Sequence, residues 1–277
     1  MTNTGYTCYS VLMAVYDREK RENLRKAMDS IICQTLPTDD FVLVCDGPLN
    51  AELDSVIEEK KGEMGNVLTV IRLERHAGLW NALNAGIVRC RNELVARMDS
   101  DDISFPDRAE RQVAVFNSHP DVSVCSGTVE EFTSDSDVPG RRRTLPETNE
   151  EIVRFAKRRC PFNHPCVMYR KSAVLAVGGY EDIYLMEDYH LWVRLLARGY
   201  RGYNIKEPIL HMRAGSEMYL RRSGVKYART QVKFFSYMRK TGFITWPGFL
   251  MSSMLRSFSA LAPNRLRMLL VGKMLRK

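Results

Sequence analysis

The first hundred residues alternate short, continuously apolar runs with segments of helical periodicity. Four of the apolar runs have strand length: residues 9–15, 41–45, 66–73 and 94–98. Three segments between them fit helices: residues 22–33, 49–61 and 79–88. Strands that lack an alternating polar face are buried on both sides, as in a parallel sheet that helices cover on both faces. The alternation therefore predicts an α/β fold with a doubly wound, mostly parallel sheet.

Polar side chains recur where these strands end. In chain order they are Tyr16, Asp46, Arg75 with His76, and Asp99 with Asp101. The carboxyl ends of parallel strands lie along one edge of the sheet, which is where open α/β sheets bind their ligands. We therefore expect these side chains to converge on a single site.

Three carboxylates crowd the end of the fourth strand, because Asp99, Asp101 and Asp102 lie within four residues. Like charges at this density repel one another unless water or a cation neutralises them. One interpretation is a divalent cation that holds an anionic ligand. The other is a solvated acidic turn that caps the helix beginning near Pro106. The cluster alone leaves both interpretations open.

The second half of the chain continues with shorter elements. We expect helices at residues 106–119, 147–157 and 172–177, a strand at 122–126, a loop at 133–146 and an extended segment at 161–169. Glu187 and Asp188 stand where a further helix begins, and helix N-termini favour carboxylates. Capping accounts for one of the two, which leaves the other as a candidate base in a cleft.

The cysteines favour a reducing compartment. All seven are scattered without a C-x-x-C pair, and four lie inside or beside apolar segments, as buried free thiols do. No Cys/His cluster has the ligand spacing of a zinc site. No signal peptide is visible, and the charge-free stretch at residues 241–255 is too short to span a membrane. We therefore expect a cytoplasmic location.

The charge of the chain is distributed unevenly. The formal net charge is +8, yet residues 218–277 contain 13 Lys or Arg and no Asp or Glu, so residues 1–217 carry a net −5. Residues 219–239 predict a basic helix with interleaved aromatics, and residues 249–261 and 266–275 are apolar segments with scattered cations. This pattern favours an interfacial helix on anionic lipid. A helical subdomain packed on the core is the alternative, and we expect no nucleic-acid partner.

Seven short motifs, in order along the chain, resemble those of family 2 glycosyltransferases of the GT-A fold. They are Ser10–Tyr16, Val44–Gly47, Gly78–Gly86, Ala96–Asp102, His164-Pro165, Gly178–Tyr180 and Glu187-Asp188. The resemblance runs from about residue 9 to about residue 200, and it is greatest to bacterial enzymes that build cell-surface polysaccharide repeat units. It implies a Rossmann-like, mostly parallel sheet flanked by helices, followed here by a basic helical C-terminal appendage.

The resemblance implies a metal-dependent, inverting transfer of a sugar from a nucleotide diphosphate sugar, here UDP-linked, to an acceptor hydroxyl. Mn²⁺ or Mg²⁺ would neutralise the departing nucleoside diphosphate. The implied acceptor is a lipid-linked saccharide on polyprenyl diphosphate, for O-antigen, capsule or exopolysaccharide. Processive members carry a Gln-x-x-Arg-Trp motif and several spanning helices, and the sequence has neither, which argues for one sugar per acceptor.

The resemblance also implies roles for individual residues. Asp188 matches the position of the base that removes the acceptor proton, and Glu187 and His164 would support it. Asp99 and Asp101 would bind the metal. The implied nucleotide-sugar contacts are Ala14, Tyr16, Asp46, Arg75, Asp99 and Asp102.

We therefore expect two parts of the chain. Residues 1–215 would form the catalytic domain, with a nucleotide-sugar-binding half at about 8–105 and an acceptor-binding half at about 106–215. Residues 216–277 would form a basic helical region that associates with the inner leaflet, on the cytoplasmic face of the inner membrane. Two alternatives explain part of the same pattern: a non-catalytic nucleotide-sugar-binding membrane scaffold, and an Asp-based phosphohydrolase.

Overall fold

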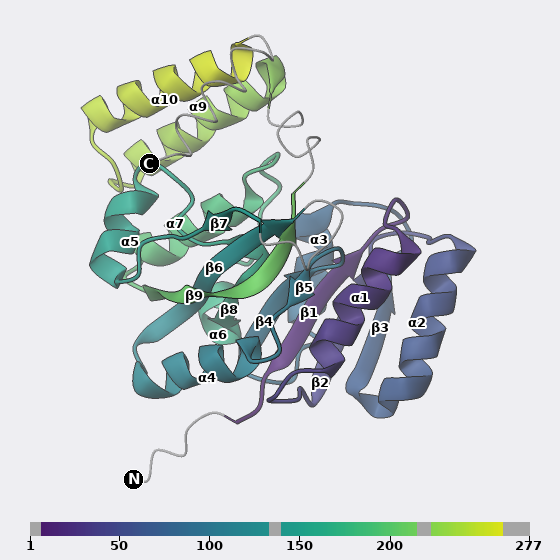
Figure 1. The fold of residues 1–277 in the computed structure, drawn as a ribbon. Coiled ribbons are helices and arrows are strands. Elements are labelled where there is room, and N and C mark those ends of the chain that lie inside the picture. Colours follow the sequence, from purple (N-terminus) through teal and green to yellow (C-terminus); the bar gives the residue numbers. More distant parts are fainter. Residues whose placement is uncertain (1–6, 133–139, 215–222, 263–277) are drawn as a thin grey trace.

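The computed structural model describes residues 7–132, 140–214 and 223–262 of the 277-residue chain. A nine-stranded mixed sheet runs through this part in the order β3-β2-β1-β4-β8-β6-β9-β5, with β7 paired to β6 (Figure 1). Its strands are β1 Ser10–Val15, β2 Asp40–Cys45, β3 Leu68–Arg72, β4 Leu94–Asp99, β5 Ile103–Ser104, β6 Val122–Phe132, β7 Arg142–Arg143, β8 Met168–Arg170 and β9 Arg201–Arg213.

Helices cover both faces of this sheet, and apolar core clusters lie on each side of it (Figure 1). The α-helices are α1 Arg21–Ile32, α2 Ala51–Met64, α3 Leu79–Ile87, α4 Arg108–Ser118, α5 Asn149–Ala156, α6 Lys171–Ala176, α7 Glu187–Ala197, α9 Gly224–Lys240 and α10 Trp246–Leu261. Two 3₁₀ turns complete the described elements: η1 Gly65–Val67 and η2 His164–Cys166.

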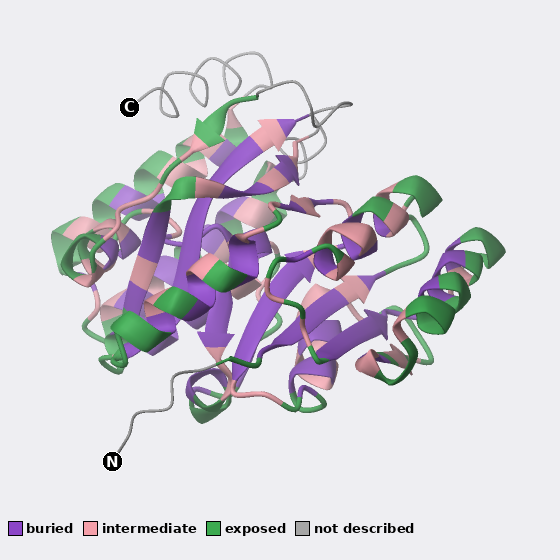
Figure 2. Ribbon diagram, turned by 60° about the horizontal axis from the view of Figure 1, so that its bottom comes forward, coloured by how far each residue is buried: buried purple, intermediate pink, exposed green. Residues whose placement is uncertain are grey.

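The N-terminal half of the sheet is parallel, as the continuous apolar runs predict. β3, β2, β1 and β4 pair in parallel through most of their lengths. Val11 and Met13 belong to the core cluster on the α1–α2 face, whereas Leu12 belongs to the cluster beneath α3. Figure 2 shows β1, β2 and β4 as almost entirely buried, whereas β3 at the end of the strand order is partly exposed. The double-sided burial explains why the strands lack an alternating polar face.

Helix α3 lies very close to the sheet because Gly86 has no side chain. A Cβ atom at Gly86 would stand 2.3 Å from Leu12 Cδ1 and 2.8 Å from Val44 Cγ2. A larger residue would therefore push α3 away from β1 and β2. The close packing fixes the start of α3, at Gly78, next to the carboxyl end of β2.

The C-terminal half of the sheet is mixed. β8 pairs antiparallel with β4 and β6, β6 runs parallel to β9, and β5 pairs antiparallel with β9. The sequence predicts a strand only at residues 122–126, but β6 extends to Phe132, and β9 is missing from the prediction. Both strands bury polar residues, such as Thr128 and Asn204, which interrupt the apolar pattern. The predicted loop and extended segment also contain β7, η2 and β8.

The C-terminal helix pair packs on α7. Phe234, Phe235 and Met238 of α9 form a third apolar cluster with Tyr189 and Val193 of α7. α10 lies alongside α9, farther from the sheet (Figure 1). Its outer surface exposes a continuous row of apolar side chains: Trp246, Leu250, Met251, Met254, Leu255, Phe258 and Leu261.

The C-terminal helix pair follows the predicted pattern in part. The basic helix predicted at residues 219–239 is α9, and the apolar segment predicted at 249–261 falls within α10. The apolar segment predicted at 266–275 lies outside the described residues. Among the helices that the structure does describe, none combines the length and apolarity needed to cross a membrane.

Candidate active site

The carboxyl ends of β1, β2 and β4 lie side by side at one edge of the sheet. The parallel register pairs Ala14 of β1 with Val44 of β2 and with Asp99 of β4. Tyr16 lies two residues after Ala14, and Asp46 lies two residues after Val44, so both residues lie along the same edge. Open α/β sheets bind ligands at such an edge.

Asp46 fixes the loop that precedes α3. Its Oδ1 accepts a hydrogen bond from the Ala77 N–H at 2.9 Å, and its Oδ2 accepts one from the Gly78 N–H at 3.0 Å. His76 Nδ1 lies 2.8 Å from the same Oδ2. The side chain is 4% exposed, so the loop covers the carboxylate almost completely. Asp46 thus holds the start of α3 against the end of β2.

Tyr16 and His76 form a flat aromatic surface at this end of the edge. Their ring centroids are 5.8 Å apart with an interplanar angle of 28°, and both side chains are exposed. Arg75 is exposed in the same loop. An exposed aromatic face is a suitable platform for a planar base, and an adjacent guanidinium suits a phosphate.

A buried arginine holds the first carboxylate of the acidic turn. Arg97 is 1% exposed, and its Nη1 donates to Asp99 Oδ2 at 2.9 Å, while its Nη2 contacts Asp99 Oδ1. Side chains two residues apart in a strand point to the same face of the sheet, so Arg97 and Asp99 can pair with each other. The pair fixes the orientation of the Asp99 carboxylate, whose side chain is 34% exposed.

Asp101 lies in a concentration of negative charge. Burial raises the pKa of Asp101 to about 7, and the neighbouring Asp99 and Glu19 carboxylates act in the same direction. Glu19 is held in place because its Oε2 accepts from Ser100 Oγ at 3.1 Å and its Oε1 accepts from Asn23 Nδ2 at 2.9 Å. Burial and the surrounding carboxylates therefore both disfavour the ionised form of Asp101.

Asp102 ties the acidic turn to β9. Its Oδ1 accepts a hydrogen bond from the Arg213 N–H at 2.7 Å, and the Arg213 side chain donates from Nε to the Asp101 carbonyl oxygen at 3.1 Å. Asp102 is 2% exposed, and burial raises its pKa well above the usual range for Asp. Asp102 thus has a structural task at the end of β9, which the sequence alone did not indicate.

The acidic turn fits a divalent cation that binds together with a diphosphate. Within the described ranges, no three His, Cys, Asp or Glu side chains are arranged to hold a metal ion by themselves. Enzymes that act on nucleotides commonly hold Mg²⁺ with one or two carboxylates, and phosphate oxygens and waters complete the octahedron. Asp99 and Asp101 supply such a pair. Burial and the neighbouring carboxylates both raise the pKa of Asp101, and a bound cation would favour its ionised form.

A second group of polar residues surrounds the start of α7. Glu187 and Asp188 form its first turn, and Asp188 Oδ2 accepts a hydrogen bond from the Cys160 thiol at 3.5 Å. Leu185, just before the helix, has a φ of 58°. A bulky residue in the left-handed region is strained, and such strain often accompanies a functional site.

His164 and Tyr180 lie between the acidic turn and α7. His164 Nε2 is 3.0 Å from the Tyr180 hydroxyl oxygen. Burial and the nearby Arg97 charge lower the pKa of His164 well below its usual value, so its imidazole is neutral. Asn84 of α3 holds the Tyr180 backbone, accepting from its N–H and donating to its carbonyl, each at 2.8 Å. The Gly-Gly-Tyr segment is thereby fixed to α3, which packs on the parallel half of the sheet.

The residues highlighted by the sequence fall into two groups joined by Arg97. Ala14, Tyr16, Asp46, Arg75, Asp99, Asp101 and Asp102 lie at the ends of the parallel strands or in the turns that follow them. His164, Glu187 and Asp188 lie in the second half. Tyr180 interacts electrostatically with both the Arg97 guanidinium and the Asp188 carboxylate. His76 was expected at this edge without an assigned role, whereas Arg97, Glu19 and Asn84 were not among the predicted site residues.

This combination of fold and site defines a class. A parallel half-sheet that ends in an Asp-x-Asp turn, joined to a mixed half that presents a helix-start carboxylate, is the architecture of a GT-A glycosyltransferase. Residues 10–178 match the model of the family described as Glycosyl transferase family 2. The chain belongs to this family and is a glycosyltransferase, rather than the phosphohydrolase or the non-catalytic scaffold considered from the sequence.

Two bacterial relatives match over most of both chains. The amylovoran biosynthesis glycosyltransferase AmsE of Erwinia amylovora is 39% identical over 85% of this chain and 88% of its own length. The UDP-Gal:alpha-D-GlcNAc-diphosphoundecaprenol beta-1,3-galactosyltransferase of Escherichia coli is 35% identical over 97% of each chain. The family resemblance seen in the sequence motifs is therefore confirmed.

The fold also matches a solved structure. The mannosyltransferase PcManGT from Pyrobaculum calidifontis, in complex with GDP-Man and Mn²⁺, superposes with a TM-score of 0.65. The match covers 90% of this chain and 69% of that one, at 16% sequence identity. It confirms the predicted GT-A fold, with a mixed sheet flanked by helices.

Proposed function

We propose that the protein is a metal-dependent, inverting, non-processive hexosyltransferase. It moves one sugar from a UDP-sugar to a lipid-linked saccharide during the synthesis of a bacterial surface polysaccharide. The observation that carries this proposal is the pairing of two chemically different carboxylate sites. The acidic turn at Asp99 and Asp101 suits a cation, and Asp188 stands apart from it, beyond Tyr180.

The donor side would hold the UDP portion. Tyr16 and His76 offer a face for the base, Asp46 shapes the loop beside it, and Arg75 is placed for a phosphate. Ala14 and Asp102 flank this edge from β1 and from the acidic turn. Mn²⁺ or Mg²⁺ held by Asp99 and Asp101 would supply charge neutralisation for the departing diphosphate.

The acceptor side would supply the base. Inversion is a single displacement at the anomeric carbon, so the acceptor hydroxyl must lose its proton on the face opposite the leaving group. Asp188 would take that proton, with Glu187 beside it in the same helix turn. His164 is neutral and hydrogen-bonded to Tyr180, so the pair can position sugar hydroxyls without adding charge.

The UDP and the lipid carrier are inferred from the Escherichia coli relative, whose name specifies UDP-Gal and a diphosphoundecaprenol-linked acceptor. The coverage of 97% of each chain supports a shared acceptor class. A lipid-linked acceptor requires that the enzyme reach a membrane surface. We assign that contact to α10 and the basic C-terminal region, on the cytoplasmic face, where anionic lipid attracts Lys and Arg.

A direct transfer assay tests this function. A panel of UDP-sugars is incubated with GlcNAc-diphosphate on a short alkyl chain, with Mn²⁺ or with EDTA, and the product linkage is determined by NMR. We expect one UDP-sugar to give a single added sugar, β-linked when the donor is α-linked, and no product in EDTA. An α-linked product would refute inversion, and absence of transfer from every UDP-sugar would refute the function.

A further inference from the structure

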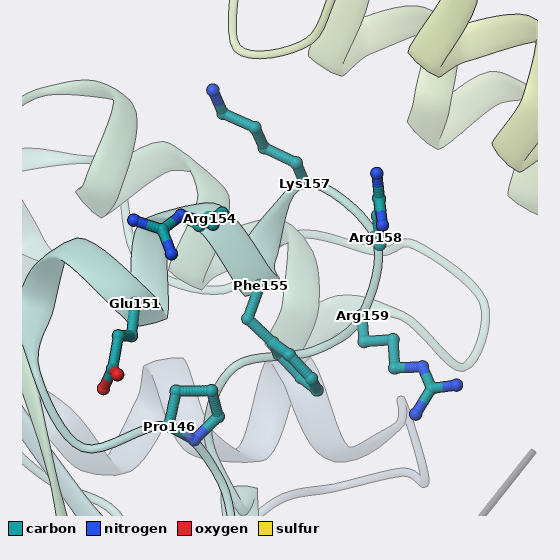
Figure 3. A pocket seen from close by; sticks show the side chains of 7 residues that line it. All are labelled: Pro146, Glu151, Arg154, Phe155, Lys157, Arg158 and Arg159. Carbon is teal, nitrogen blue, oxygen red and sulfur yellow. The ribbon is translucent and has the colours of Figure 1, made fainter. Parts of the chain in front are cut away.

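A basic pocket lies at the end of α5, outside the site described so far. Its volume is about 650 Å³, and its walls include Arg154, Phe155, Lys157, Arg158 and Arg159 (Figure 3). We call it the α5 pocket. Figure 3 shows the four cationic side chains spread around the end of the helix, with Phe155 between them.

The charge of the α5 pocket is strongly one-sided. The residues that line it include four cations and a single carboxylate, that of Glu151. Arg154, Lys157 and Arg158 are exposed, and within the part of the chain that the structure describes none of these three forms an ion pair. The helix C-terminus accounts for some attraction of cations to this end of α5. It does not account for three successive cations in the turn beyond the helix.

The α5 pocket adjoins the proposed base. Arg159 is followed directly by Cys160, whose thiol donates to Asp188 Oδ2 at 3.5 Å. The Tyr189 hydroxyl, one residue after Asp188, donates to the Ala156 carbonyl oxygen at 2.7 Å. The end of α5 and the start of α7 are thus held together, so the cations lie on the acceptor side of the site.

The α5 pocket also adjoins α10. Arg256 of α10 donates a hydrogen bond from Nη2 to the carbonyl oxygen of Arg158. Met254, Leu255 and Phe258 lie in the same two turns of α10 and are between 60% and 71% exposed. The cations therefore lie beside the candidate catalytic carboxylate and beside the helix that carries the candidate lipid-facing surface.

We propose that the α5 pocket binds the diphosphate of the lipid-linked acceptor, an inference that rests on the proposed function. In such an acceptor the diphosphate joins the sugar to the lipid, so the three parts follow one another in a line. Asp188, the α5 pocket and α10 follow one another in the same order. Guanidinium groups bind phosphate oxygens in pairs, which suits a group with two adjacent phosphates.

A binding experiment tests the α5 pocket without any sugar transfer. Geranyl diphosphate is titrated into the protein by calorimetry in EDTA, where the acidic turn cannot use a metal to hold it. The variant Arg154→Gln/Lys157→Gln/Arg158→Gln is compared with Lys26→Gln/Lys61→Gln/Arg89→Gln, which removes three exposed cations elsewhere. We expect the first variant to weaken binding about tenfold or more and the second to leave it unchanged. Equal affinity in all three proteins, or no binding by the wild type, would overturn the proposal.

Kinetics then separate the acceptor from other sources of phosphate. For the GlcNAc-diphosphate acceptor, we expect the α5 pocket variant to raise the acceptor KM about tenfold with kcat and the donor KM unchanged. The same sugar on an uncharged alkyl glycoside should show no difference. A variant that loses flotation on phosphatidylglycerol vesicles but keeps its affinity for geranyl diphosphate would show that the pocket binds lipid headgroups instead. If the α5 pocket variant transfers sugar at the wild-type rate with an unchanged acceptor KM, the pocket proposal is refuted and the proposed function still stands.

Discussion

Asp188 differs from the other carboxylates of the site in the interactions that its side-chain oxygens make. Asp46 accepts two backbone N–H groups, Asp99 is paired with Arg97, and burial leaves Asp101 with a raised pKa. Asp188 accepts a thiol hydrogen bond at 3.5 Å, which is weak. Its lone pairs remain available to a sugar hydroxyl, which a general base requires.

The variant Asp188→Asn tests this difference. The amide keeps the shape of the side chain but cannot accept a proton, so we expect turnover to fall about 10²- to 10⁴-fold. UDP binding, measured by calorimetry with Mn²⁺, should be unchanged because the donor edge is untouched. Asp182→Asn, an exposed carboxylate in the preceding loop, is the matched control and should retain full turnover. Turnover of the Asp188 variant within a few-fold of the wild type would exclude this residue as the base.

Single residues show how far the sequence can predict the site. Strand-end position identifies Asp46 and Asp99, because periodicity locates strand ends. It does not identify Arg97, since one arginine inside an apolar run gives no sign of the face on which it lies or the partner it meets. Glu19 and Asn84 act through contacts across 81 and 96 residues of chain, and such contacts exist only once the sheet is assembled.

At the scale of elements, the interface between α7 and α9 contains a buried histidine. His190 lies 4.7 Å from Tyr237 and 6.0 Å from Phe234, measured between ring centroids. Burial and the Arg194 charge together lower the pKa of His190 to about 4, although the Glu181 charge acts in the opposite direction. The neutral imidazole thus suits the aromatic interface that joins the C-terminal helices to the helix of the proposed base.

This interface should make stability depend on pH. The pKa of His190 is lower in the folded state than in the unfolded state, so the folded state binds fewer protons and stability falls as pH decreases from 6.5 towards 4. We expect His190 alone to contribute a loss of about 2 kcal/mol between pH 7.5 and pH 5. Urea unfolding of wild type and His190→Gln at both pH values measures it. An equal loss in both proteins would contradict the assignment.

The elements also show where periodicity stops being informative. The parallel strands and the start of α7 follow from apolar runs and from carboxylates at a helix start. β6 and β9 do not, because their inward-facing residues include polar side chains that neighbours satisfy. Asn204, for example, donates to the carbonyl oxygens of Pro146 and Pro161. A sequence pattern does not reveal that such a partner will be present.

At the scale of the whole molecule, the C-terminal part of the sequence combines positive charge with the exposed apolar side chains of α10. The last 60 residues contain 13 Lys or Arg and no Asp or Glu. In addition, α10 exposes a row of seven large apolar side chains. An anionic bilayer matches both properties, because apolar side chains enter the interface while Lys and Arg meet the headgroups. We therefore assign the bilayer as the surface that covers α10.

Vesicle flotation tests that assignment. Replacing Met254, Leu255 and Phe258 by Gln removes about 3 kcal/mol of apolar transfer, so partitioning onto phosphatidylglycerol vesicles should fall about a hundredfold. Val88→Gln/Leu175→Gln, which changes two exposed apolar residues elsewhere, should float like the wild type. If the wild type does not float, the assignment of α10 to the bilayer is wrong. If the wild type elutes as a dimer that the α10 variant dissociates, α10 contacts another protein chain instead.

In the proposed function, the packing of α10 on α9, and of α9 on α7, places the membrane contact apart from the catalytic site. With α10 on a bilayer, enzyme and lipid-linked acceptor diffuse in the same plane, and the area of membrane rather than the volume of solution sets how often they meet. The water-soluble donor still arrives from solution at the edge of the parallel strands. Turnover at a fixed amount of acceptor should then fall as more bilayer is added, because dilution now takes place in two dimensions.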